Sequence, residues 1–70
     1  MMPLAMANPG EGGTIRQVTG KDDVRLHLAA LGFVAGQPVT VVAKLAGSVI
    51  LNIRGTRVAL DKKLAARVMI

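Results

Sequence analysis

The chain has 70 residues, with nine Lys and Arg against four Asp and Glu, a formal charge of +5, and no Cys, Trp or Tyr. This length predicts a single small domain, residues 1–70, that buries only about 60% of the surface its unfolded chain exposes. Without Cys and with a single His, the chain can build neither a disulfide framework nor a thiolate or imidazole zinc site. Packing must therefore stabilise the domain, and 51% of the residues are apolar.

The same composition disfavours catalysis and membrane insertion. One His, four carboxylates, one Ser and four Thr show no grouping typical of nucleophile-and-base or paired-carboxylate chemistry. The longest run of low polarity, residues 28–36, is much shorter than the roughly 20 residues that a membrane-spanning helix needs. The apolar start of the chain lacks Lys and Arg and is not typical of a signal peptide. We therefore expect a non-enzymatic binding or regulatory module in the cytoplasm, without a cofactor.

The first half of the chain predicts one strand and the only long helix. Residues 1–10 form a lead segment that we expect to be mobile, and the β-favouring residues 14–19 form the first strand. Asp22 and Asp23 then suit a helix start, because a carboxylate there caps free N–H groups and complements the helix dipole. The helix is predicted to run from about residue 23 to residue 31.

The spacing of apolar residues assigns faces to this helix. Val24, Leu28 and Leu31 recur at i, i+4 and i+7, which places them in one stripe directed at the core. Gly32 follows as the stop in the left-handed conformation, and Phe33 is expected in the core. Leu26 lies on nearly the opposite side from the stripe and is expected to be exposed.

The second half of the chain reads as short strands separated by glycine turns. The predicted elements are strands 39–44, 49–54, 57–60 and 67–70 and a one-turn helix at 62–66 that Asp61 caps. Gly36, Gly47 and Gly55 mark the turns between them. About five strands joined by hairpins predict a mostly β fold that removes its edges by closing into a small SH3-like barrel. The long helix would then lie across one open end.

Three segments, in order, resemble the FeoA family. Residues 9–15, PGEGGTI, are similar to its opening, and residues 28–41, in which LGF is followed by Gly36 and a β-branched strand, are similar to its central signature. Residues 55–60 with the tail 64–70 resemble its closing pattern. The chain departs from the family where Gly-Asp-Pro is common, because Gly47 is followed here by Ser48 and Val49. The resemblance covers essentially the whole chain.

The resemblance implies a function. FeoA proteins are small SH3-like accessory proteins of ferrous iron uptake, linked to transition metals at the family level, that contact the cytosolic part of the membrane transporter FeoB. The same fold also occurs as a domain of metal-dependent repressors, but nothing in this chain resembles their helix-turn-helix. A second hypothesis from the residues is a small basic nucleic-acid-binding barrel, which the near absence of aromatic side chains disfavours.

Few residues stand out as a site. Asp23 and His27, at i and i+4, are a weak two-ligand metal candidate, and two ligands leave a site incomplete. The cations are dispersed along the chain, as on an ordinary solvated surface. Candidate partner-binding residues are Arg25, Leu26 and Ala29 on the helix, Leu45, Ala46 and Gly47 at a hairpin tip, and Arg54 and Arg57. Weak self-association through a free edge of strands 39–43 or 49–53 is a further hypothesis.

Overall fold

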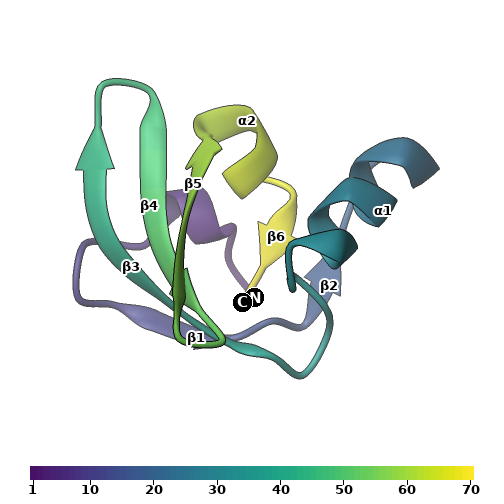
Figure 1. Ribbon diagram of the computed structural model, residues 1–70, viewed down its shortest axis with the longest axis horizontal. Coiled ribbons are helices and arrows are strands. Elements are labelled where there is room, and N and C mark those ends of the chain that lie inside the picture. The colour runs from purple at the N-terminus through teal and green to yellow at the C-terminus, as the bar shows by residue number, and fades with distance from the viewer.

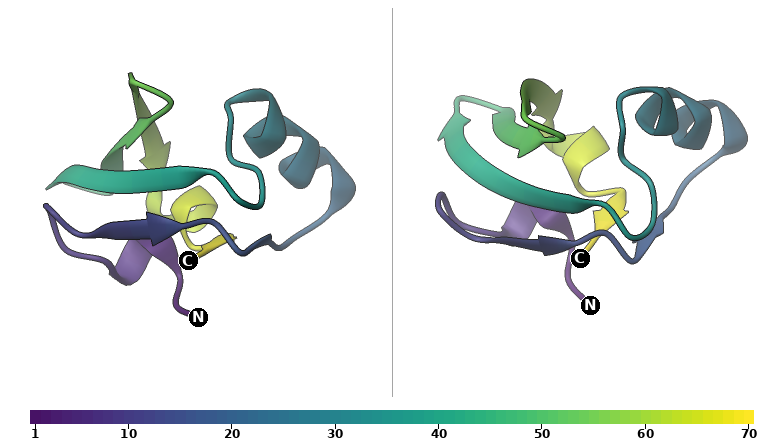
Figure 2. Two further views of the ribbon diagram at one scale, coloured as in Figure 1. Left: turned by 90° about the horizontal axis from the view of Figure 1, so that it is seen from below. Right: turned by 60° about the horizontal axis from the view of Figure 1, so that its bottom comes forward.

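The computed structural model describes residues 1–70 and has nine elements (Figure 1). They are the 3-10 helix η1 (Leu4–Met6), β1 (Gly12–Thr14), β2 (Gln17–Val18), α1 (Asp22–Ala30), β3 (Pro38–Leu45), β4 (Ser48–Ile53), β5 (Thr56–Asp61), α2 (Lys62–Ala65) and β6 (Val68–Met69). The antiparallel strands form a four-stranded sheet in the order β1-β3-β4-β5 and a two-stranded sheet, β2-β6. The larger sheet curls around the core, as the curvature of β3 shows (Figure 2).

The first predicted strand is in fact two strands that belong to different sheets, so the fold has six strands and not five. In β1, Gly13 lies opposite Val39 of β3, whereas in β2, Gln17 lies opposite Met69 of β6. Ile15 stands between them with 1% of its surface exposed, and its N–H donates to the carbonyl of Gln37 at 2.9 Å. The chain therefore crosses from one sheet to the other at Ile15, where its side chain enters the core.

The remaining predicted strands and the one-turn helix are confirmed to within two residues at each end. Val49, Leu51 and Ile53 on β4 are buried, as their alternation predicted. Asp61 caps α2, since its Oδ1 accepts a hydrogen bond from the N–H of Leu64 at 2.8 Å. Thirteen buried apolar residues make up the core: Leu4, Ala7, Ile15, Leu28, Phe33, Val39, Val41, Val49, Leu51, Ile53, Leu60, Ala65 and Val68.

The lead segment is a packed part of the fold, contrary to the expectation of a mobile start. Leu4 and Ala7 are 0% and 1% exposed, and both belong to the core. Met2 and Ile70 exchange two backbone hydrogen bonds of 2.8 Å, so the two ends of the chain lie side by side. The sequence pattern missed this because the lead is too short for a periodicity and its partner is at the far end of the chain.

Helix α1 begins and packs differently from the prediction. Its N-cap is Lys21 without a side-chain hydrogen bond, while Asp22 and Asp23 lie inside the first turn. Leu28 is fully buried and Val24 packs against the core, but Leu31 is 38% exposed. The helix ends at Ala30, so Leu31 no longer follows the stripe, and Phe33 fills the core in its place.

Helix α1 also does not close an end of the barrel. It projects at one end of the long axis, with Leu28 as its only buried residue (Figures 1 and 2). Gly32 has φ 103°, and a Cβ there would lie 3.1 Å from Cδ of Arg54. The chain therefore turns back beside the β4–β5 turn at a point where a larger residue would crowd an arginine.

Both hairpins of the larger sheet use two-residue turns in which both residues have positive φ. The turns are Ala46-Gly47, with φ of 43° and 112°, and Arg54-Gly55, with φ of 54° and 76°. This conformation suits the twist of antiparallel strands, but it strains a first residue that is neither Gly, Asn nor Asp. Gly55 thus has the structural role predicted for it, and Ala46 is the strained position of the tip.

Replacing Ala46 with Asn should stabilise the protein. Asn tolerates the left-handed conformation better than Ala, so we expect the free energy of unfolding to rise by about 0.5 to 1 kcal/mol. Urea unfolding followed by far-UV circular dichroism measures this, because the chain has no Trp or Tyr. The matched control is Ala35→Asn, an exposed turn alanine with negative φ, which should change stability little. An equal gain in both variants would contradict the role of φ.

Candidate functional site

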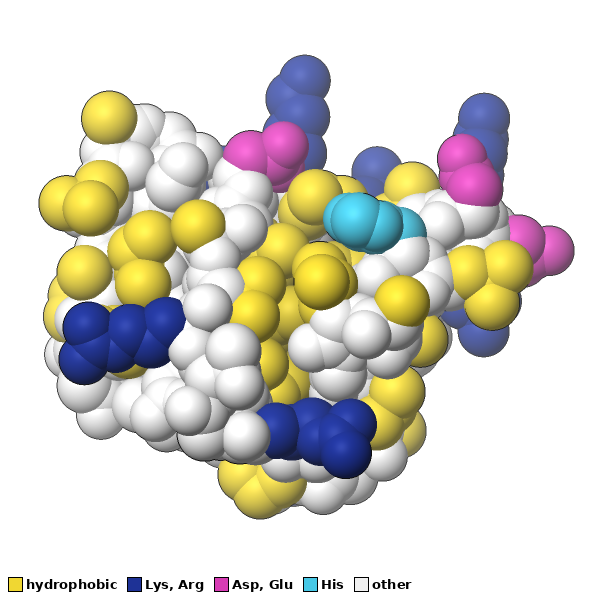
Figure 3. All heavy atoms as spheres, viewed as in Figure 1, with side chains coloured by type: hydrophobic (Ala, Val, Ile, Leu, Met, Phe, Trp, Pro, Cys, Tyr) yellow, Lys and Arg dark blue, Asp and Glu magenta, His cyan; other side chains and the backbone are white.

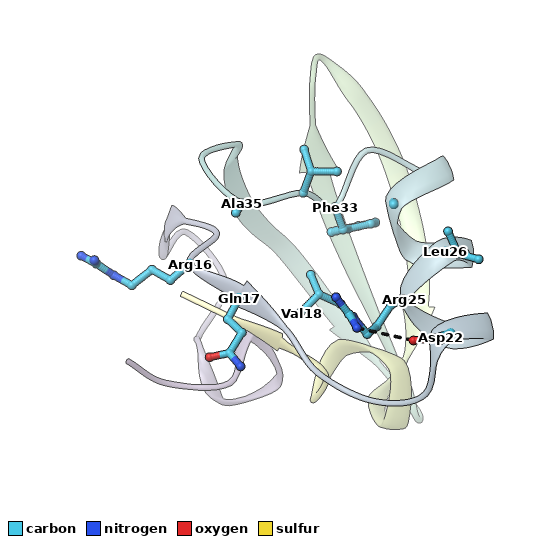
Figure 4. A pocket seen from close by; sticks show the side chains of 10 residues that line it. Arg16, Gln17, Val18, Asp22, Arg25, Leu26, Phe33 and Ala35 are labelled. Atoms are coloured by element: carbon cyan, nitrogen blue, oxygen red, sulfur yellow. Dashed lines mark ion pairs between the residues drawn. The ribbon is translucent and has the colours of Figure 1, made fainter.

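The most developed surface feature is a cleft of about 620 Å³ between α1, β2 and the loop that joins α1 to β3 (Figure 4). Six of its ten lining residues are hydrophobic. The lining residues are Arg16, Gln17, Val18, Asp22, Arg25, Leu26, Ala29, Phe33, Val34 and Ala35. Because α1 packs on the core through Leu28 and the partly buried Val24, its Leu26 side remains uncovered and forms one wall of the cleft.

Apolar side chains of this cleft are unusually accessible. Leu26 is 71% exposed and Val34 is 42% exposed, while Phe33 at the base is buried. Leu26 and Val34 together present an apolar surface that a partner can cover at little desolvation cost. Phe33, which belongs to the core, forms the base of this surface. Exposed apolar side chains over a buried floor are typical of a docking surface for a protein partner.

The charged side chains at the rim of the cleft have a net positive charge. Its charged residues are Arg16, Arg25 and Asp22. Arg25 and Asp22 form an ion pair of 3.5 Å, but their side chains are 55% and 94% exposed, so the pair contributes at most about 1 kcal/mol. Figure 4 shows Arg25 extending from α1 toward Val18 and Arg16 pointing away from the cleft. A partner carboxylate can therefore reach either guanidinium.

Six of the eight candidate partner residues fall into two groups at opposite ends of the molecule. Arg25, Leu26 and Ala29 come together on the cleft wall. The hairpin tip lies at the other end of the long axis, and residues 45–47 border a second hollow of about 440 Å³. All three ribbon views separate the tip from α1 (Figures 1 and 2). A partner that contacts one group need not reach the other.

Arg54 and Arg57 line neither hollow. Arg54 lies in the β4–β5 turn against Gly32, and Arg57 is exposed on β5. Figure 3 shows the Lys and Arg side chains of one face standing apart, without a continuous stripe. A basic stripe is what non-specific binding to nucleic acid requires, so this face offers no support for that hypothesis.

Sequence reasoning missed the β2 and loop walls of the cleft. Gln17, Val18, Val34 and Ala35 line it, and none of them shows a pattern of its own. Their common position depends on the pairing of β2 with β6 and on the turn at Gly36, which has φ 90°. A residue-to-residue signal between the two halves of the chain would have been needed to find them.

The weak metal candidate gains no third ligand. Asp23 and His27 are exposed on α1, and the structure contains no group of three or more His, Cys, Asp or Glu that could hold a metal ion. The Met residues offer no alternative, since Met1 and Met6 are mainly exposed and Met69 lies in β6. None of the helices is long and apolar enough to span a membrane.

The curled sheets and the apolar core define a small SH3-like β domain. The sequence model of the FeoA domain matches residues 2–70, so the chain belongs to the FeoA family. The chain is 27% identical over 70 residues to a candidate Fe(2+) transport protein A of Methanocaldococcus jannaschii, covering 100% of this chain and 85% of that protein.

Solved structures agree with the family and the fold. The chain is similar to the crystal structure of an iron uptake regulatory protein (FeoA), with 32% identity, a TM-score of 0.90, and 97% of this chain and 90% of that chain covered. The zinc complex of FeoA from Stenotrophomonas maltophilia, named a prokaryotic SH3 domain protein, matches with 27% identity, a TM-score of 0.75 and coverages of 99% and 88%. The predicted mostly β, SH3-like fold is thus confirmed.

The fold is also shared with a part of a transcriptional repressor. A manganese-dependent repressor matches with 20% identity and a TM-score of 0.86, and the match covers 94% of this chain but 38% of the repressor. At this identity the similarity shows the fold alone.

Proposed function

We propose that this protein is a non-enzymatic accessory protein of ferrous iron uptake, located in the cytoplasm, that acts by contact with the cytosolic part of a FeoB-type membrane transporter. Its family membership supports the process, since two of its relatives are named for Fe(2+) transport and iron uptake. The observation that carries the contact mechanism is the α1 cleft, a hollow of about 620 Å³ with a mainly hydrophobic lining on a domain of 70 residues.

The chemistry of the cleft indicates what the partner presents. An apolar side chain would enter between Leu26 and Val34, which are exposed in the free protein and would be desolvated together. A carboxylate on the partner would pair with Arg16 or Arg25 at the rim, where it gives orientation and association rate more than affinity. The protein itself supplies no chemistry to iron and alters transport by being bound.

The experiment compares the two ends of the molecule. Purified protein and the cytosolic domain of the transporter are titrated by isothermal calorimetry, with Leu26→Asp and Leu45→Asp as matched variants. Both leucines are strongly exposed, at 71% and 61%, so neither change should alter thermal unfolding much. We expect Leu26→Asp to weaken binding by about 2 kcal/mol, as for a central apolar contact, and Leu45→Asp to change it little.

Each other outcome has a definite meaning. Loss of binding in Leu45→Asp alone would move the contact to the hairpin tip and refute the cleft. Full binding by both variants would refute both surfaces, and no binding by the unaltered protein would refute the transporter contact itself. Arg16→Glu tests the rim, and its loss of affinity should shrink as salt is added because exposed charges are screened.

A further inference from the structure

The outer edge of β5 is the longest strand edge that the fold leaves without a partner. The six-residue β5 stands at one end of the order β1-β3-β4-β5, and the opposite end is β1 with three residues. Of the two strands predicted to offer a free edge, 49–53 lies in β4, which is paired on both sides, and 39–43 lies in β3, which β1 covers only at Pro38–Thr40. An exposed edge of this length must be considered as a pairing surface.

The register of the β4–β5 hairpin decides which backbone groups face this edge. The N–H of Lys62 donates to the carbonyl of Gly47 at 3.0 Å, and the Cα pairs then run from Ser48 with Asp61 to Ile53 with Thr56. Hydrogen-bonded and non-hydrogen-bonded pairs alternate in an antiparallel ladder. Thr56, Val58 and Leu60 therefore bond to β4, and the N–H and C=O groups of Arg57, Ala59 and Asp61 face outward. None of these three residues makes a backbone hydrogen bond outside the ladders.

The side chains of the same three residues are complementary to themselves. Arg57, Ala59 and Asp61 are all exposed and share one face of β5. In an antiparallel pair of two identical β5 strands with Ala59 opposite Ala59, Arg57 of each copy lies opposite Asp61 of the other. The two Ala59 residues meet at the two-fold axis that relates the copies, and their small side chains do not collide there. A register shifted to place Arg57 opposite Arg57 would bring like charges together and form fewer bonds.

We infer that two copies of this protein associate through β5, in the register centred on Ala59. The four-stranded sheet of one copy then joins that of the other in one continuous sheet. The three outward N–H groups of each strand then donate to the partner strand's three outward carbonyls. The two Arg57–Asp61 pairs fix the register. The cap of α2 does not prevent this pairing. Asp61 accepts the capping hydrogen bond through Oδ1, and its Oδ2 is available to Arg57 of the second copy. No other ion pair competes for Arg57, since Arg25–Asp22 is the only one in the structure.

The first test is sedimentation equilibrium of the full chain from micromolar to millimolar concentration, with two charge-reversed variants. Arg57→Asp places two carboxylates opposite each other in each pair, and Asp61→Lys places two cations there, so each variant alone should dimerise at least about tenfold more weakly. Mixed in equal amounts, the two variants regain both opposite-charge pairs and should form a heterodimer about as strong as the original dimer. Because Asp61→Lys also removes the α2 cap, its folding is checked by circular dichroism.

The second test locates the contact on the chain. Amide hydrogen exchange at high and low protein concentration should show protection that rises with concentration at Arg57, Ala59 and Asp61, while Val58 and Leu60, already bonded to β4, change little. Ala59→Pro removes the central outward N–H without removing a bond to β4 and should abolish the dimer. A monomer at every concentration, a dimer without this protection, or a variant mixture that stays monomeric would each overturn the inference.

Discussion

Replacing Leu28 with Asp should leave the protein unfolded at room temperature. Leu28 is 0% exposed and is the only buried residue of α1. The substitution removes about 2 to 3 kcal/mol of apolar burial and places a carboxylate in a core that contains no buried polar side chain, at a further cost of several kcal/mol. A domain of this size has only about 3 to 10 kcal/mol of stability. Far-UV circular dichroism and urea titration would show the loss of the cooperative transition.

Two control variants separate burial from other effects at this helix. Leu26→Asp makes the same chemical change two residues away on the exposed side, and the cooperative transition should stay within about 0.5 kcal/mol of the original, as for surface substitutions. Leu28→Met keeps the volume and should cost less than about 1.5 kcal/mol. If Leu28→Asp folded normally, or if Leu26→Asp unfolded the protein as well, the assignment of the helix faces would be wrong.

Leu4→Ala should destabilise the protein by about 2 to 5 kcal/mol, the range for removing a fully buried leucine side chain. Leu4 is 0% exposed in η1 and lies in the same core cluster as Ala65 and Val68 from the other end of the chain. The cavity left by its side chain would loosen the contact between the two ends. Urea unfolding measures the change, and the midpoint should fall clearly without a change in slope.

The matched control for this position lies in the same short helix. Met6 is 68% exposed, so Met6→Ala should leave the unfolding midpoint almost unchanged. If Leu4→Ala were as harmless as Met6→Ala, the first residues of the chain would behave as an added segment and not as part of the core.

Local patterns predicted the elements whose cause is local. The alternation of Val49, Leu51 and Ile53 gave β4 the correct face, and the glycines at turns placed both hairpins. Leu28 and Leu26 were assigned to the correct sides of α1 by their helical spacing alone. In each case, the residues that fix the conformation are within a few positions of one another.

The failures have their cause in contacts between distant parts of the chain. The division of the first strand at Ile15 depends on two different partners, β3 and β6. Leu31 is exposed because Phe33 reaches the core after the turn at Gly32, which periodicity along the helix does not report. The cleft itself was not predicted: helical spacing singled out only Arg25, Leu26 and Ala29 on its α1 wall, whereas its β2 wall depends on pairing with β6.

The hydrogen bonds between Met2 and Ile70 also bear on how the protein folds. They join residues 68 positions apart, and β2 reaches β6 over a similarly long stretch of chain. Closing such large loops lowers the conformational entropy of the chain before stabilising contacts form. This small protein should therefore fold slowly for its size, at a rate set by its topology. The hairpins β3–β4 and β4–β5 can form early from neighbouring residues, and the meeting of the two chain ends is then the late step that completes the core.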